Sequence, residues 1–350
     1  MPPKVTHYTS RPDFYNPERM RIFKFISLAT LKKLLTGLTV PQQYVCTGLE
    51  SFSDPLSVYM TTRMAGYCTD VTASHVFVGY QPLCMLLPFD TGDDHHEEVC
   101  LNFAAGPFEP DAVWRGFQTG TKCVARLILK YNGSEKFPGN YRLFIGIYGH
   151  HSFLGKFHQL FNRVRERFQE KRIDNVSLPG NLHDQVRIAY SVPRIIPLVT
   201  VSDGQRMNMF PTDLHGHVGN NFYAGSLRHG GKANSHVEKI GKIAISKMPA
   251  AECRFVYTLG KNHMREMKEI SSFDVSNTTT PGFQIPVPSL ALNFLELKLL
   301  RSVDIGIHRI HLYEKVGNVE LSSGETLCHI HQYYAQWRID HGQSFKILLR

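Results

Sequence analysis

The chain has 350 residues, of which 42% are hydrophobic and 20% charged, so it has the composition of an ordinary globular protein and enough length for two domains. No apolar run approaches the roughly 20 residues that span a bilayer, and the first residues lack a basic and then apolar secretory signal, so we expect a cytoplasmic protein with no membrane partner. The net charge of +9 is spread along the chain without a basic block that carries interleaved aromatic residues, so we expect no nucleic-acid partner and relate the charge to a phosphorylated cofactor or dinucleotide.

The first half of the chain contains β-prone runs and two stretches typical of helices. A helix is expected over Leu28 to Leu35, between a possible N-cap serine and a glycine stop. Apolar residues at helical spacing predict a second, amphipathic helix over Ser152 to Lys171. Short strands, separated by turn-forming residues, are expected over Val76 to Tyr80, Glu98 to Phe103, Thr121 to Lys130 and Tyr141 to Tyr148.

A polar, turn-rich stretch from Ile173 to Asp184 is the candidate domain boundary, which divides the chain into residues 1–180 and 181–350. One short helix is expected beyond it, from Asn234 to Gly241. The rest of this half has the near-alternation of half-buried antiparallel strands, and five or six strands with little helix indicate a small closed barrel. The expected strands are Gln185 to Ser202, Lys242 to Ser246, Cys253 to Leu259, Leu290 to Leu300 and Ile305 to Val316.

Two polar stretches, Ser202 to His217 and Gly225 to Ser235, are predicted to be long loops between strands, where binding groups often lie. The second has the groups that a phosphate requires: positive charge, hydroxyl donors, flexible glycines and the start of a helix with unsatisfied N–H groups. An ordinary surface loop with helix capping is the alternative, and composition does not separate the two. The candidate phosphate ligands are Ser226, Arg228, Lys232 and Ser235.

The first of these loops has the residue types that a flat heteroaromatic ring requires. Asn208 and Thr212 offer hydrogen-bond donors, and Met207, Phe210 and Pro211 offer apolar surface. Each of these residues has an ordinary structural role as its alternative, so the pattern has meaning only when the residues are taken together.

The order of these motifs resembles the flavin reductase-like, FMN-binding split-barrel family. A strand is followed by Asp-Gly-x-x-x-Asn-x-x-Pro-Thr, Ser-Leu-Arg, Lys-x-x-Ser, a short helix and a strand. Two later runs, Phe294 to Lys298 and Asp304 to Tyr313, are similar to the family's paired strands with a Gly-x-His turn. The resemblance covers roughly Val192 to Val319. The chain departs from the family at Gly306-Ile307-His308, where Gly-Asp-His is usual, and at Ser235, where threonine is common.

The resemblance implies an antiparallel split β-barrel that binds FMN, usually as a homodimer. Asn208 and Thr212 would contact the flavin ring, while Ser226, Arg228, Lys232 and Ser235 would contact its ribityl phosphate. The implied activity is that of a flavin-dependent oxidoreductase, in which the flavin takes hydride from NAD(P)H and passes electrons to an unknown acceptor. His308 would lie near the flavin and handle a proton, although a histidine satisfied within the sheet is the alternative.

Two other functions stay open on the sequence. A flavin-binding or sensor module without turnover has the same fold and motifs. A metal-dependent hydrolase or oxygenase would use His215 and His217 with Asp213, but no HExxH pair is present and H-x-H spacing is common by chance. The seven cysteines are dispersed without a CxxC pair, which indicates reduced thiols instead of disulfides or a zinc ribbon. We therefore expect no metal.

The N-terminal half, residues 1–180, is expected to be a β-rich or α+β domain with no chemical motif of its own. Three interpretations stay open for it: a degenerate second barrel that mimics a partner subunit, a cap over the flavin, or an unrelated binding domain. The pattern of residues favours none of them.

Overall fold

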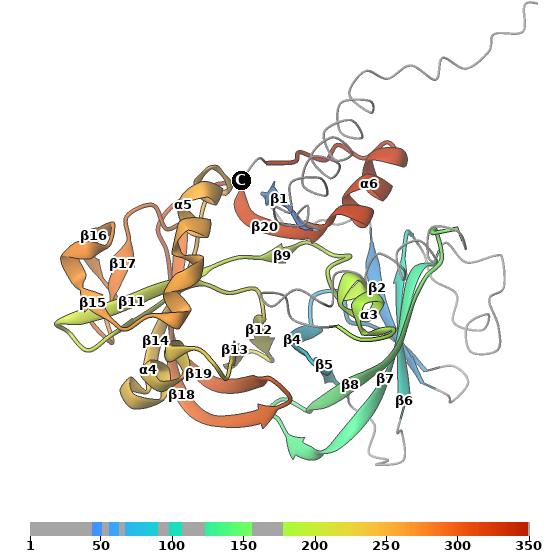
Figure 1. Cartoon of the computed structure of the whole chain (residues 1–350), viewed down its shortest axis with the longest axis horizontal. Helices are drawn as coiled ribbons and strands as arrows, with labels where there is room; N and C mark the ends of the chain where they lie inside the picture. The colour runs from blue at the N-terminus through green and yellow to red at the C-terminus, as the bar shows by residue number, and fades with distance from the viewer. Residues whose placement is uncertain are drawn as a thin grey trace, which may run out of the picture. The chain divides into compact units, whose positions relative to one another are not determined.

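Antiparallel strands make up most of the chain that the structure describes, as the sequence predicted (Figure 1). The structure is a computed structural model, and it describes residues 44–50, 56–62, 67–89, 98–106, 123–155 and 178–348. The predicted helix over Leu28 to Leu35 and nearly all of the one over Ser152 to Lys171 lie outside these residues. No helix within the described ranges combines the length and the apolar content that crossing a membrane requires.

Seven strands from the first half of the chain form one sheet, in the order β3-β2-β6-β7-β8-β5-β4. Every neighbouring pair is antiparallel, and the four strands that the sequence predicted here are confirmed, with β7 and β8 longer than expected. The strands are β2 (Ser57–Thr62), β3 (Cys68–Asp70), β4 (Val76–Tyr80), β5 (Leu83–Pro88), β6 (Glu98–Ala104), β7 (Cys123–Lys136) and β8 (Tyr141–His151).

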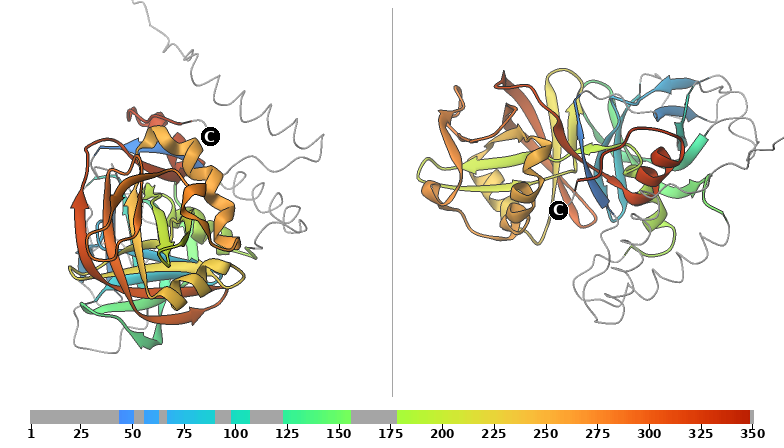
Figure 2. Two further views of the ribbon diagram at one scale, coloured as in Figure 1. Left: turned by 90° about the vertical axis from the view of Figure 1, so that its left-hand side faces the viewer. Right: turned by 90° about the horizontal axis from the view of Figure 1, so that it is seen from above.

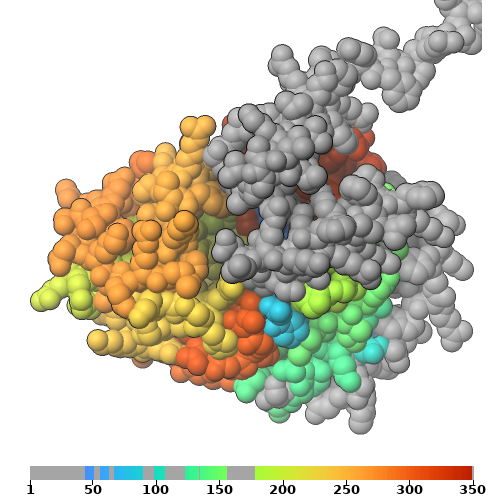
Figure 3. All heavy atoms as spheres, viewed as in Figure 1, coloured from blue at the N-terminus to red at the C-terminus, as the bar shows by residue number. Residues whose placement is uncertain are grey.

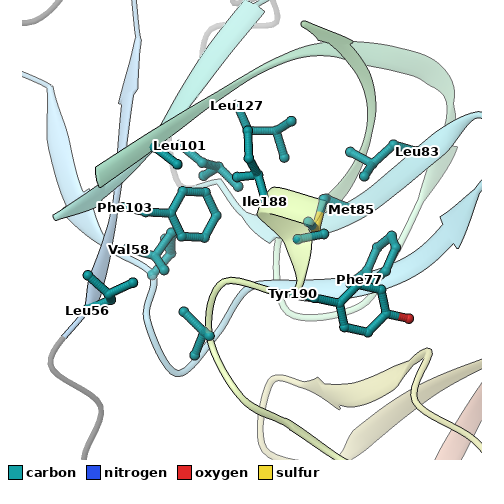
Figure 4. Packing of buried hydrophobic residues seen from close by; sticks show 14 of the residues in the cluster. Leu56, Val58, Phe77, Leu83, Met85, Leu101, Phe103, Leu127, Ile188 and Tyr190 are labelled. Atoms are coloured by element: carbon teal, nitrogen blue, oxygen red, sulfur yellow. The ribbon is translucent and has the colours of Figure 1, made fainter. Parts of the chain in front are cut away.

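One face of this N-terminal sheet packs on α3 (Leu182–Ala189). Val186 and Ile188 of the helix belong to one cluster of buried side chains. Figure 4 shows Ile188 in this cluster, together with Phe103 and Leu127 from the strands. Gly149 of β8 permits the close approach, because an added Cβ would lie 3.0 Å from the backbone of the helix. The predicted strand from Gln185 is therefore wrong over α3, where apolar residues at helical spacing meet the sheet.

The last part of the chain returns to the same core. β20 (Thr326–His331) pairs with β1 (Tyr44–Leu49) and with the short β9 (Arg194–Ile195) to form a three-stranded sheet. It leads into α6 (Gln332–Asp340), and Ile330, Tyr334 and Trp337 pack in the core of the N-terminal sheet. Segments that are almost 300 residues apart in sequence thus share one hydrophobic cluster.

The C-terminal sheet has eight strands in the order β12-β13-β19-β18-β14-β10-β11-β15. It is antiparallel and curved (Figure 2), but within the described residues its hydrogen bonding ends at β12 and β15, so the predicted closed barrel is not found. A separate hairpin consists of β16 (Val275–Thr279) and β17 (Pro286–Pro288). The eight strands are β10 (Leu198–Ser202), β11 (Arg206–Pro211), β12 (His215–Val218), β13 (Phe222–Arg228), β14 (Lys242–Lys247), β15 (Lys268–Glu269), β18 (Asn293–Ile305) and β19 (His308–Glu320).

Helical segments of the second half lie beside this sheet. α4 (Lys232–Ile240) confirms the predicted short helix, which begins two residues earlier and ends at Gly241 in the left-handed conformation that glycine favours. The strand predicted from Cys253 to Leu259 is wrong, because α5 (Cys253–Thr258) is a helix that buries Cys253 and Val256 on one side. Short 3-10 turns complete this region: η2 (Ala250–Glu252), η3 (Leu259–Met264) and η4 (Ile270–Ser272).

The predicted loop from Ser202 to His217 is also wrong, because it contains β11 and most of β12. Each residue of β11 from Met207 to Pro211 faces a partner on β10, and its buried side chains extend the core of the sheet. Asn208 and Pro211 are of residue types that are uncommon in strands. Here the buried Asn208 side chain is hydrogen-bonded within the protein, and Pro211 is the last residue of the strand.

The two large sheets meet where the turn after β4 contacts the turn between β18 and β19 (Figure 3). The Ile307 amide donates to the Gln81 carbonyl at 3.2 Å, and a Cβ at Gly306 would overlap that carbonyl. Another cluster of buried side chains combines residues of both sheets, including Val78 and Leu312. Residues 44–350 thus form one compact unit, and the division of the chain at residue 180 stays a prediction.

Candidate functional site

The loop between β13 and α4 brings two of the predicted cationic residues to the start of a helix. Arg228 ends β13, and Lys232 is the first residue of α4. The Gly231 amide and the Asn234 side-chain amide both donate to the Arg228 carbonyl, at 3.1 and 2.7 Å, which fixes the loop. The N-cap is Gly231, which offers no side-chain acceptor, and the first turn contains no acidic residue. The N–H groups of this turn are therefore suited to an anion.

The charge of Lys232 is engaged by a surface carboxylate. Its Nζ lies 2.8 Å from Glu266 Oε1, and the two side chains are 57% and 69% exposed. Hydrogen bonding to Lys232 lowers the pKa of Glu266 and raises that of Lys232, so both groups are ionised at neutral pH. Ser235 donates its hydroxyl to the Lys232 carbonyl at 2.8 Å. An anion at this helix start must compete with Glu266 for Lys232.

His308 is the first residue of β19, and it faces Arg228 on the neighbouring strand β13. The imidazole is 1% exposed, its Nδ1 is 3.3 Å from Ser226 Oγ, and its ring stands edge-on to that of Tyr80 at 4.5 Å. Burial and the nearby Arg228 lower the pKa of His308 to about 4, so the ring is neutral at pH 7. Its Nε2 is buried and has no hydrogen-bond partner among the described residues. Tyr80 comes from the N-terminal half, and no sequence motif pointed to it.

The structure puts the two predicted ring contacts on another strand. Asn208 is buried in β11, and its amide donates to the carbonyls of Asn262 and Arg265 at 2.9 and 3.2 Å. Its oxygen accepts from the Met209 amide. Thr212 follows β11, is half-buried, and donates its backbone N–H to the Pro197 carbonyl. Ser226, Arg228 and His308 thus lie together, with Lys232 and Ser235 on the adjoining helix turn. Cofactor contact by any of them stays a prediction.

A pocket of about 370 Å³ lies elsewhere, between the turn before β4, the segment around β9 and the C-terminal sheet. None of the seven predicted site residues lines it. On β13 its lining residue is Tyr223, five positions from Arg228, which corresponds to roughly 17 Å along a strand. The polar lining residues are Thr72, His75, Arg194, Asp213, His215, His217, Tyr223, Lys247 and Asn293.

Asp213 is the acidic residue of this lining, and two groups already hold it. The Tyr190 hydroxyl donates to its Oδ2 at 2.7 Å, and His329 Nε2 lies 2.9 Å from the same oxygen. Burial alone would raise the pKa of Asp213, but His329 and Tyr190 outweigh burial and lower it to about 2. In Figure 4 the Tyr190 hydroxyl oxygen points away from the other labelled side chains of the core. Tyr190 thus connects the N-terminal core to the pocket.

The histidines of the pocket bind to the protein itself. His215 uses both nitrogens, Nδ1 with the Tyr223 hydroxyl at 2.5 Å and Nε2 with the Ile195 carbonyl at 3.0 Å. His75 uses Nδ1 with the Val71 carbonyl. Burial lowers the pKa of His75, His215 and His217 to about 4, so all three are neutral at pH 7. In the part of the chain that the structure describes, no group of three or more such side chains is arranged to hold a metal ion.

Comparisons with known proteins find likenesses of structure only. No protein-family model matches the sequence, and no curated protein matches it. An FMN-binding protein from Thermus thermophilus with bound p-hydroxybenzaldehyde is 19% identical, with a TM-score of 0.35 over 43% of this chain and 81% of that chain. BorF, the flavin reductase component of a bacterial two-component tryptophan halogenase, is 16% identical, with a TM-score of 0.38 over 48% and 98%.

The NADH:FAD oxidoreductase SgcE6 of Streptomyces globisporus C-1027 is 14% identical, with a TM-score of 0.39 over 51% of this chain and 100% of that chain. All three of these proteins are described as FMN-binding proteins or flavin-reducing enzymes. TM-scores below 0.5 at under 20% identity do not establish the fold or the activity of this chain.

Proposed function

We propose that the chain binds FMN at the loop from Arg228 to Lys232 and acts as a flavin-dependent oxidoreductase with NAD(P)H as electron donor. One observation carries the proposal: Arg228 and Lys232 come just before and at the start of α4, whose N-cap offers no acceptor and whose first turn contains no acid. A phosphate dianion matches such a helix start in charge and in hydrogen-bond donors. Ser226 and Ser235 are the hydroxyl residues nearest to it in sequence.

The buried His308 supports the same site. When bound, the flavin would supply the hydride-accepting chemistry, which no side chain supplies. His308 holds one proton on a neutral ring, and its buried Nε2 lacks a partner among the described residues, so a ligand would reach this atom only after a local rearrangement. The Asn208 amide already donates to two backbone carbonyls, those of Asn262 in η3 and of Arg265 just after it. Unless η3 moves, the donors for a flavin ring are therefore Thr212 and the backbone beside it.

An absorbance titration with FMN tests the proposal. Loss of a charge-assisted contact costs on the order of 1.5–3 kcal/mol, so Arg228→Ala and Lys232→Ala should each weaken FMN binding about tenfold or more. Lys239→Ala, in the last turn of the same helix, is the matched control and should bind FMN like the unaltered chain. Unchanged affinity in both site variants, or no flavin binding at all, would overturn the assignment.

NAD(P)H then separates the enzyme from a binding module. Bleaching of the bound flavin by NADH or NADPH under anaerobic conditions is the expected result for an oxidoreductase. Flavin bands that NAD(P)H leaves unchanged would instead favour a flavin-binding or sensor module. The predicted homodimer is tested separately by sedimentation velocity, in which a dimer of the 39.9 kDa chain has about twice that mass.

A further inference from the structure

The guanidinium of Arg194 has an incomplete set of hydrogen bonds. This residue lines the pocket between the two sheets, in β9. Its Nε donates to the Ala189 carbonyl at 2.9 Å, and its Cζ lies 5.2 Å from the centre of the Phe77 ring. Its Nη2 is buried and has no hydrogen-bond partner among the described residues. Since a guanidinium has five N–H donors, part of this group is left for a ligand.

No acidic side chain of the described residues forms an ion pair with Arg194, although the charge of Asp213 acts on it through space. Asp213 lines the same pocket, but its Oδ2 is held by Tyr190 and His329, and it forms no ion pair with Arg194. Burial lowers the pKa of Arg194 to about 10, which leaves the guanidinium charged at neutral pH. A guanidinium withdrawn from water without a directly bonded counter-charge is costly, so a carboxylate that bonds to it is favoured.

The rest of the pocket determines which kind of ligand body can be attached to the anionic group. Its apolar walls include Val76, Val192, Ile245 and Leu295, and its volume of about 370 Å³ suits a small organic molecule. The three histidines are neutral at pH 7, so Lys247 is the second cation of the lining, and Asp213 is its ionised acid. The site therefore offers the Arg194 guanidinium next to an apolar surface.

We propose that this pocket binds a small organic carboxylate, with the carboxylate on the Arg194 guanidinium and the apolar body against Val76, Ile245 and Leu295. The planar fork of an arginine matches the two oxygens of a carboxylate. A phosphate dianion would place a second negative charge near the ionised Asp213 of the same lining, which disfavours it. The proposal concerns a site distinct from the loop at Arg228 and does not depend on flavin binding.

Isothermal titration calorimetry of the full chain without added FMN tests it. The probes are acetate, benzoate and 2-naphthoate, which differ in apolar size, with benzamide as the neutral counterpart of benzoate and phenyl phosphate as the dianion. At least one carboxylate should bind, and benzoate should bind about tenfold or more tightly than benzamide, because the charge-assisted contact is lost in the amide. Failure of all three carboxylates to bind, equal affinity for benzamide, or tighter binding of phenyl phosphate would overturn the proposal.

Two variants link the binding to Arg194. Arg194→Met should weaken carboxylate binding about tenfold or more, and Arg194→Lys should weaken it less, since it keeps the charge and loses the fork. Arg206→Met is the matched control, because Arg206 is exposed, pairs with Asp203 and lies outside the pocket. Replacing a buried unpaired charge by an apolar side chain should leave the urea midpoint unchanged or raise it, which shows that the variant is folded. Unchanged carboxylate affinity in both Arg194 variants would overturn the proposal.

Discussion

The loop at Arg228 and the pocket at Arg194 both carry positive charge, but their surroundings differ. Lys232 at the start of α4 is exposed and pairs with an exposed carboxylate. Arg194 lies against Phe77 with no carboxylate partner among the described residues, and the nearby Asp213 is held by Tyr190 and His329. Exposed ion pairs contribute little to stability because water screens them, whereas buried groups shift their pKa strongly. Similar residue types therefore have different energetic consequences in the two regions.

The largest effect is expected from the histidine beneath the exposed loop. The pKa of His308 is about 4 in the folded chain, below the ordinary 6.5, so its contribution is fully present above pH 6.5. As the pH falls from 6.5 to 4, the unfolded chain takes up the proton first, and stability falls by roughly 3 kcal/mol from this group. His308→Gln should therefore lose less stability on acidification. The measurement is the free energy of unfolding in urea at pH 7, 5 and 4. The exposed His229→Gln is the control, and an identical loss in both variants would contradict the prediction.

A smaller effect is expected from the carboxylate of the pocket. The pKa of Asp213 is lowered from 3.8 to about 2, so its contribution is present above pH 4 and is lost as the pH falls through 2. Asp213→Asn should therefore lower the free energy of unfolding at pH 7 by about 2 kcal/mol. Urea denaturation measures this, with the exposed Asp274→Asn as control. Equal stability of the two variants would show that Tyr190 and His329 do not depend on the charge of Asp213.

The smallest effect is expected at the surface pair of Lys232. Glu266→Gln removes the carboxylate that competes for Lys232, so FMN should bind about two- to fivefold more tightly, which is the scale of an exposed ion pair. The measurement is the FMN titration described above. Glu238→Gln removes a carboxylate from α4 that pairs with Arg309 instead, and it should leave the affinity unchanged. Weaker FMN binding in Glu266→Gln would show that Lys232 does not face the phosphate.

Local sequence patterns were sufficient for α4 and for β4, β6, β7, β8, β10, β14, β18 and β19, but they missed other strands, such as β5, β13 and β20. Alternating apolar residues predicted β18 and β19, and Gly241 correctly marked the end of the helix. The same reasoning failed at α5, because Phe255, Val256 and Tyr257 favour strands by type while their spacing buries one side of a helix. It also failed at β11, where Asn208 and Pro211 resembled loop residues. Tertiary packing decided both cases.

The pocket was beyond the reach of sequence patterns, because its lining comes from separate segments. Arg194 and Asp213 are nineteen positions apart, and Val76 belongs to the other sheet. Asp213 had appeared beside His215 and His217 as a possible metal set, yet its actual partners are Tyr190 and His329. The residues from Ser226 to Ser235 could be grouped from the sequence because they are contiguous, but the predicted long loop is wrong, since β13 continues to Arg228 and α4 begins at Lys232.

The return of β20 and α6 to the N-terminal sheet has a consequence for how the protein is made. Ile330, Tyr334 and Trp337 complete a core whose strands leave the ribosome first. Domains generally fold as units while synthesis proceeds, but this sheet lacks part of its interior until β20 and α6 have been translated. Until then its apolar face is left uncovered on that side, and a chain that terminates before residue 326 never acquires the cover at all.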